Sequence, residues 1–171
     1  MARERGAFDF ETYDWVHPFA FALRWGPREA RETHFERLAD GGNPGTMAVR
    51  CLQEMLVIAE SGGPVEWWAH NGGKFDTLFL LAAAQRMGWI VSANVTGGGR
   101  IVTATFRKPT SKTTLHMRDS YAVVQSSLKN AVKDFQCDAA KTFKEDDYRG
   151  DMRNLSPEAL KAGCVQDCEC V

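Results

Sequence analysis

Strand-like runs alternate with apolar helices along this chain, and that order limits the fold more than any other feature. Alternation of apolar and polar residues predicts strands, and a period of 3.6 residues predicts helices. The expected strands are 7–11, 17–25, 65–70, 89–106 (a hairpin with a Gly-rich turn) and 113–124, and the expected helices are 46–60, 75–88, 126–137 and 156–171. Residues 27–45 are polar and rich in turn formers, which leaves a loop and a short charged strand both open. We therefore expect an α/β fold, a mixed sheet with helices packed on it.

Length and composition indicate one folded domain over residues 1–171. Hydrophobic residues make up 44% of the chain and charged residues 25%, which is typical of a globular protein. A formal charge of −1 excludes a strongly basic surface, so a nucleic acid would have to be met locally or through metal ions. No apolar run approaches the ~18 residues of a membrane span, and the N-terminus lacks the apolar core of a signal peptide. We expect a cytoplasmic protein without membrane contact.

The first expected strand carries two carboxylates on one face. Successive side chains of a strand point to opposite faces. Phe8 and Phe10 therefore face one side of the sheet, while Asp9 and Glu11 stand together on the other. Two neighbouring like charges raise each other's pKa unless a cation lies between them. The pair therefore indicates a bound cation.

Two further acids occupy the ends of other elements. Asp76 opens the apolar helix 75–88, where the helix dipole favours a carboxylate, so a purely structural role is an open alternative. Asp167 shares a face of the last helix with Leu160, Cys164 and Val171 and therefore points towards the core, where an uncompensated carboxylate is costly. Four carboxylates form a hard oxygen site that suits Mg²⁺ or Mn²⁺. Two such ions roughly 4 Å apart can drive in-line attack on a phosphodiester.

The cysteines do not form a comparable set of ligands. Their number is odd and no secretory signal precedes them, which favours reduced thiols: Cys51, Cys137, Cys164, Cys168 and Cys170. The cluster at 164–170 invites a zinc site, but on a helix Cys170 lies about 200° round from Cys168. A tetrahedral site also needs a fourth ligand, and the neighbouring sequence offers none. We expect these cysteines to act as small buried apolar residues.

Three segments in combination resemble a known family. They are "DFET" at 9–12, "AHNGGKFD" at 69–76 and the helix with "QDCEC" at 166–170. Together they resemble the 3′–5′ proofreading exonuclease domain of family B DNA polymerases, part of the DEDD exonuclease superfamily. The resemblance is strongest to the protein-primed branch of phages and linear plasmids, and "RDSYAVVQSSLKNAVKDF" at 118–135 extends it.

The resemblance implies a ribonuclease H-like mixed sheet flanked by helices and a two-metal-dependent exonuclease that removes nucleotides from single-stranded DNA 3′ ends. With it come two Mg²⁺ or Mn²⁺ ions held by four catalytic acids: Asp9, Glu11, Asp76 and Asp167. It assigns a catalytic lysine to Lys141, with Lys144 as the alternative. It assigns DNA binding to Thr12, Asn71, Phe75, Ser120 and Tyr121. For three of these a structural role is also open: Thr12 as a strand former, Asn71 as a turn residue and Phe75 as a core aromatic.

The same resemblance leaves the setting of the domain open. It is either the N-terminal part of a longer polymerase or a free-standing nuclease, and the expected partner is a polymerase domain in the same chain or a terminal protein. The last helix lacks a C-cap signal, which favours the longer protein. If the source is viral, the protein acts in the host cytoplasm. An RNase of the same superfamily would share the chemistry and is a third alternative.

One position departs from the family pattern. The third motif of the family has a tyrosine four residues before its aspartate, which orients the attacking water, and here that position is Gly163. A glycine inside a helix costs about 1 kcal/mol relative to alanine. Either another tyrosine (Tyr121 or Tyr148) orients the water, or the activity is weakened. The alternative function is therefore a degenerate exonuclease fold that binds nucleic acid or serves a structural role without hydrolysis.

Overall fold

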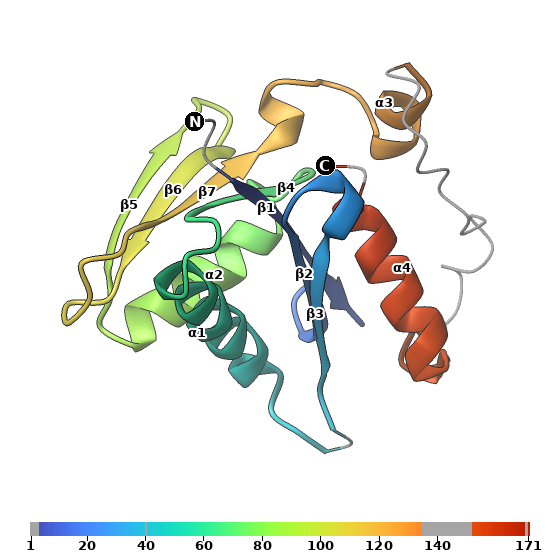
Figure 1. Cartoon of the computed structure of the whole chain (residues 1–171), viewed down its shortest axis with the longest axis horizontal. Helices are drawn as coiled ribbons and strands as arrows, with labels where there is room; N and C mark the ends of the chain where they lie inside the picture. The colour runs from blue at the N-terminus through green and yellow to red at the C-terminus, as the bar shows by residue number, and fades with distance from the viewer. Residues whose placement is uncertain (1–3, 40, 135–151, 170) are drawn as a thin grey trace.

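A single seven-stranded sheet organises the chain, in the order β3-β2-β1-β4-β7-β6-β5 (Figure 1). The computed structural model describes residues 4–39, 41–134, 152–169 and 171. The strands are β1 (Arg5–Thr12), β2 (Pro18–Trp25), β3 (Glu32–Arg37), β4 (Glu66–Ala69), β5 (Ile90–Val95), β6 (Ile101–Arg107) and β7 (Leu115–Asp119). The helices are α1 (Met47–Glu60), α2 (Asp76–Arg86), α3 (Leu128–Asp134) and α4 (Pro157–Glu169), with short 3₁₀ turns η1 (Arg28–Ala30), η2 (Pro44–Thr46), η3 (Ser120–Ala122) and η5 (Met152–Asn154).

The direction of the central strands decides where functional groups meet. Strands β1, β4 and β7 run parallel to one another, whereas β2 and β3 on one side and β6 and β5 on the other are antiparallel to their neighbours. The segments that leave β1, β4 and β7 therefore emerge at the same edge of the sheet. In open α/β sheets, ligands bind at this carboxyl edge.

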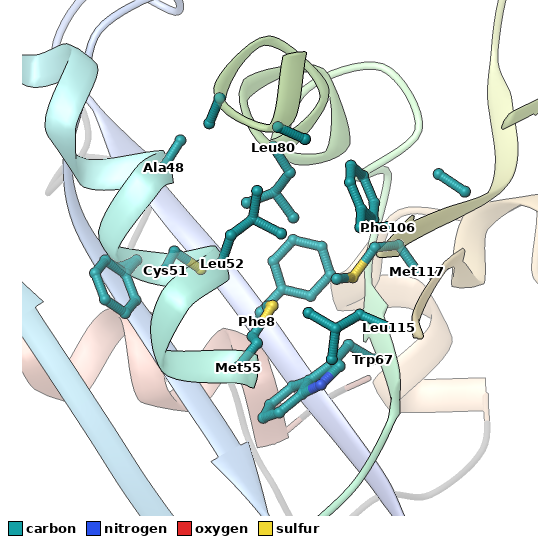
Figure 2. Packing of buried hydrophobic residues seen from close by; sticks show 14 of the residues in the cluster. Phe8, Ala48, Cys51, Leu52, Met55, Trp67, Leu80, Phe106, Leu115 and Met117 are labelled. Carbon is teal, nitrogen blue, oxygen red and sulfur yellow. The ribbon is translucent and has the colours of Figure 1, made fainter. Parts of the chain in front are cut away.

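One face of the sheet is covered by α1 and α2, which build the main core. Figure 2 shows Phe8 of β1 surrounded by Leu52 and Met55 of α1 and by residues of the neighbouring strands, including Trp67 and Met117. All of these side chains are almost fully buried. The alternation predicted for the first strand is confirmed, because Phe8 and Phe10 belong to this core while the Asp9 carboxylate lies near the sulfur of Cys164 on α4, which covers the other face.

Helix α4 covers the opposite face, over β1 and β2 (Figure 1). Small side chains of β2 pack against this helix. Ala20 packs with Leu160, and Ala22 packs with Cys164 and Cys168. These residues are buried, and the small side chains of Ala20 and Ala22 let the helix lie close to the sheet at these positions. As a result, strand β2 is buried on both faces.

The structure confirms the α/β prediction and corrects one boundary. Within 27–45 the short charged strand is the correct alternative, as β3. The strand expected over 113–124 ends at Asp119, because the Asp119 carboxylate accepts the Tyr121 N–H at 3.0 Å and starts a 3₁₀ turn instead. In the described part of the chain, no helix has the length and apolar character that crossing a membrane requires.

Candidate active site

The four predicted acids come from three elements that meet at the carboxyl edge of the sheet. Asp9 and Glu11 lie on β1, on the face that α4 covers. Carboxylate oxygens of these two residues and the Cys164 sulfur all lie within 4.8 Å of one another. Asp76 begins α2, and its Oδ1 accepts the Phe10 N–H at 3.1 Å, which fixes the helix start against β1.

Asp167 completes the group from α4, on the turn of helix that follows Cys164. It lines one cleft together with Asp9 and Asp76, and it is half-buried. Glu11 is 8% exposed and Asp76 is 6% exposed. Four carboxylates within one partly closed site repel one another, so the arrangement is electrostatically unfavourable without a cation.

Proton affinities in the site reflect this crowding. Burial raises the pKa of Asp9 well above its ordinary value, and the charge of Glu11 raises it further. The charges of Asp76 and Asp167 act on Asp9 in the same direction. Burial also raises the pKa of Asp76 from 3.8 to about 7, against the effect of its backbone hydrogen bonds. Divalent cations are the groups that reverse such effects in oxygen-lined sites.

The cleft around these acids has a volume of about 330 Å³ and an open mouth. Its walls contain three of the residues predicted to bind DNA, namely Thr12, Asn71 and Phe75. Asn71 has a left-handed backbone with φ of 61°, which non-glycine residues adopt at a cost. The next two positions need glycine, because a Cβ on Gly73 would lie 1.9 Å from the Ile101 carbonyl oxygen and one on Gly72 2.6 Å from the Ala69 Cβ.

The other two predicted DNA contacts lie beside this cleft rather than in its wall. The Ser120 hydroxyl is 3.0 Å from Nδ1 of His70, and His70 itself lines the cleft. The Tyr121 ring meets the His70 ring edge to face at 5.7 Å between centroids. Ser120 and Tyr121 therefore support the cleft through His70. The predicted catalytic Lys141, with Lys144 and Tyr148, lies outside the described residues.

No family model and no curated protein matches this chain. Solved structures do match it. The chain superimposes on phi29 DNA polymerase complexed with primer-template DNA and incoming nucleotide substrates, with a TM-score of 0.67 and 18% identity over 99% of this chain. It also superimposes on phi29 DNA polymerase complexed with single-stranded DNA, with a TM-score of 0.65 and 17% identity over 98% of this chain.

The fold is ribonuclease H-like. The mixed sheet with helices on both faces is shared with these polymerase structures, as predicted. The match covers 30% of the length of each polymerase chain. At 17–18% identity the likeness is one of fold, and function has to be argued from the site.

Sequence reasoning missed a buried ion pair close to Asp76. Arg100, at the turn between β5 and β6, donates to Asp119 at 2.5 Å, and the two side chains are 14% and 1% exposed. The guanidinium also lies 4.3 Å from the centre of the Tyr121 ring. The two residues are 19 positions apart in sequence, and no motif links them. Their pairing could be found only from the fold.

Two more residues of the site were not predicted to be functional. Cys164 was expected to be a small buried residue, and it is buried, but its sulfur also faces the Asp9 and Glu11 carboxylates. Trp15 lines the mouth of the cleft. Gly163, one helical turn before Asp167, is buried within α4.

Proposed function

We propose that this chain is a two-metal-dependent 3′–5′ exonuclease that hydrolyses phosphodiester bonds at the 3′ ends of single-stranded DNA. The observation that carries the proposal is the gathering of Asp9, Asp76 and Asp167 in one cleft, with Glu11 against Asp9. Burial raises the pKa of Asp9 and of Asp76, so the ionised forms of both carboxyls are disfavoured unless a cation compensates them.

The donor set fits two Mg²⁺ or Mn²⁺ ions, since carboxylate oxygens are the ligands that both ions prefer. Asp9, Glu11, Asp76 and Asp167 would hold the ions, and Asp9 lies where the charges of the other three acids act on it. When bound, the ions supply a hydroxide nucleophile and stabilise the leaving oxygen. Asp76 is held for this task by the Phe10 N–H, so its oxygen position is fixed before substrate arrives.

The shape of the cleft favours an unpaired strand over a duplex. Its volume of about 330 Å³ is at the lower end of pockets that hold small ligands, so it accommodates a nucleotide rather than a base-paired end. Thr12, Asn71 and Phe75 would hold the terminal nucleotide. Phi29 DNA polymerase, whose structures share this fold, has been solved with single-stranded DNA and with primer-template DNA. We therefore propose residues 1–171 as an exonuclease domain with a proofreading role beside a DNA polymerase.

Gly163 favours a second candidate function. Without a side chain at this position, water is not oriented from α4 in the manner of the family, and positioning by one group is commonly worth a factor of ~10² to 10³. Slow but metal-dependent cleavage is the expected result for the exonuclease. A degenerate fold that binds nucleic acid without hydrolysis is the alternative.

A direct assay separates the two candidates. The protein is incubated with a 5′-labelled single-stranded oligonucleotide in Mg²⁺, Mn²⁺ or EDTA, and the products are resolved by length. We expect a ladder that shortens one nucleotide at a time from the 3′ end, slower on a paired end and absent in EDTA. Asp9→Ala and Asp167→Asn should abolish it, whereas Glu158→Gln, an exposed acid on the same helix as Asp167, should not.

Cleavage of a circular single strand would contradict an exonuclease. If the native protein binds DNA but cleaves it no faster than the Asp9→Ala protein does, the non-catalytic alternative replaces the exonuclease. An RNA oligonucleotide of the same sequence tests the remaining RNase alternative.

A further inference from the structure

A tryptophan at the mouth of the cleft is unusually exposed. Trp15 is 76% exposed, whereas Trp67 and Trp89 are almost fully buried. Its backbone is left-handed, with φ of 66°, an uncommon conformation for a bulky side chain. A folded chain gains nothing in stability by holding a large aromatic ring in water and a strained backbone together, so the arrangement points to a role outside the fold.

The loop that carries Trp15 is held by its neighbours. The Asp14 carboxylate accepts the N–H groups of Val16 at 3.2 Å and His17 at 2.9 Å, and it also contacts the His17 ring. The His17 ring stacks on Tyr13, with 5.1 Å between centroids and 9° between planes. These bonds fix the turn on both sides of Trp15, so its ring is presented by a preorganised loop.

The Trp15 ring also has a defined place relative to the acids. It lines the same cleft as Asp9, Asp76 and Asp167. Its centroid lies 5.8 Å from that of Phe75, with 43° between the ring planes, so the two rings touch and form one aromatic lip. Phe75 directly precedes Asp76, which connects this lip to the carboxylates.

We propose that Trp15 binds an unpaired base of single-stranded DNA by stacking, at the entrance to the acid-lined cleft. The inference rests on the proposed function, in which the acids that line the cleft act on a phosphodiester of single-stranded DNA. A single strand entering such a site exposes flat bases, and aromatic rings stack on them without regard to sequence. The loss of one stacked base weakens binding by about 5- to 150-fold.

The test uses binding without hydrolysis, so that it is independent of catalysis. Intrinsic tryptophan fluorescence is followed while an oligothymidylate is added in EDTA, and affinities are confirmed by anisotropy of a labelled strand. We expect quenching in the native protein and a 5- to 150-fold weaker affinity for Trp15→Ala. Trp15→Phe should retain most of the affinity because it keeps an aromatic face. Val16→Ala, an exposed neighbour in the same loop, should change nothing.

An oligonucleotide in which every nucleotide is abasic separates stacking from a structural role of the residue. Native and Trp15→Ala proteins should bind this strand equally, since no bases are present. If Trp15→Ala loses affinity for both strands alike, or if it matches the native protein on both, the stacking proposal is overturned. If Trp15→Ala does not fold, Trp15→Leu, which keeps a large apolar side chain but no aromatic face, takes its place in the comparison with the native protein on both strands.

Two further outcomes are distinguishable. If the native protein degrades single strands in Mg²⁺ but its fluorescence does not respond to DNA, the exonuclease stands and the role of Trp15 is refuted. If Trp15→Ala changes the mass of the particle by light scattering and leaves DNA affinity intact, the ring is a protein interface and the proposal is again refuted. Absence of both binding and cleavage in the native protein removes the proposed function itself.

Discussion

Replacing Asp76 with asparagine should stabilise the protein when no metal is present. The folded state raises the pKa of Asp76 from 3.8 to about 7, chiefly through burial and then through the charges of Asp119 and Asp167. A tenfold change in proton affinity corresponds to about 1.4 kcal/mol, so the ionised carboxylate destabilises the fold by at most about 4 kcal/mol. Asp76→Asn removes the charge and keeps an oxygen to accept the Phe10 N–H.

The sign of the pH dependence follows from linkage. Because the folded state holds this proton more tightly than the unfolded state, the penalty is nearly absent below about pH 4 and complete above about pH 7. We expect Asp76→Asn to raise the free energy of unfolding by about 2–4 kcal/mol at pH 8, and by less than half of that at pH 5. The lower value allows for relaxation of the neighbouring carboxylates.

Urea unfolding in EDTA at both pH values measures the effect, with Glu158→Gln as a control that should stay within about 0.5 kcal/mol. Adding Mn²⁺ at a hundred times its Kd should stabilise the native protein by about 2.7 kcal/mol and the Asp76→Asn protein by less. An asparagine variant whose advantage is the same at pH 5 and pH 8, or absent at both, would refute the view that the buried, ionised Asp76 carboxylate destabilises the fold.

Three other changes test separate parts of the site. Gly163→Tyr should raise the rate of 3′-end cleavage by up to ~10² to 10³ without changing DNA affinity, and an unchanged rate in single-turnover assays means that another group orients the water. Arg100→Ala should cost about 3–5 kcal/mol in urea unfolding, because it leaves the buried Asp119 carboxylate unpaired. Adding Asp119→Asn should recover part of that loss. Cys164→Ser should weaken Cd²⁺ binding in calorimetry but leave Mg²⁺ binding unchanged, because only the soft ion gains from the thiol.

Local sequence patterns were sufficient to predict most helices and strands and the faces on which the acids lie. Alternation placed Phe8 and Asp9 on opposite faces of β1, and helical spacing placed Asp167 on the same side of α4 as the buried Cys164. These inferences succeeded because they depend on periodicity within one element, which the backbone geometry enforces. The sequence did not decide between a loop and a strand for β3. Most of its residues are half-buried and show no clear alternation, so the periodicity that reveals other strands is missing.

Features that depend on distant parts of the chain could not be predicted. Helix α4 approaches Asp9 across 155 positions of sequence, and the thiol of Cys164 reaches the backbone oxygen of Asp9 only through that packing. The end of β7 was missed because the Asp119 side chain, not the local pattern, decides where the backbone turns. The left-handed backbone of Trp15 could not be predicted from the sequence. Glycine and asparagine are the residues that commonly adopt this conformation, and a tryptophan gives no such indication.

The small residues on β2 have a consequence for the order of events during synthesis. Asp9 is synthesised well before its partner Asp167, which α4 delivers when that helix docks on Ala20 and Ala22. Contacts between such distant segments form late in folding. A nascent chain therefore carries an incomplete acid cluster until α4 has been made and packed. Under the proposed function, hydrolysis at this centre cannot begin before α4 has docked.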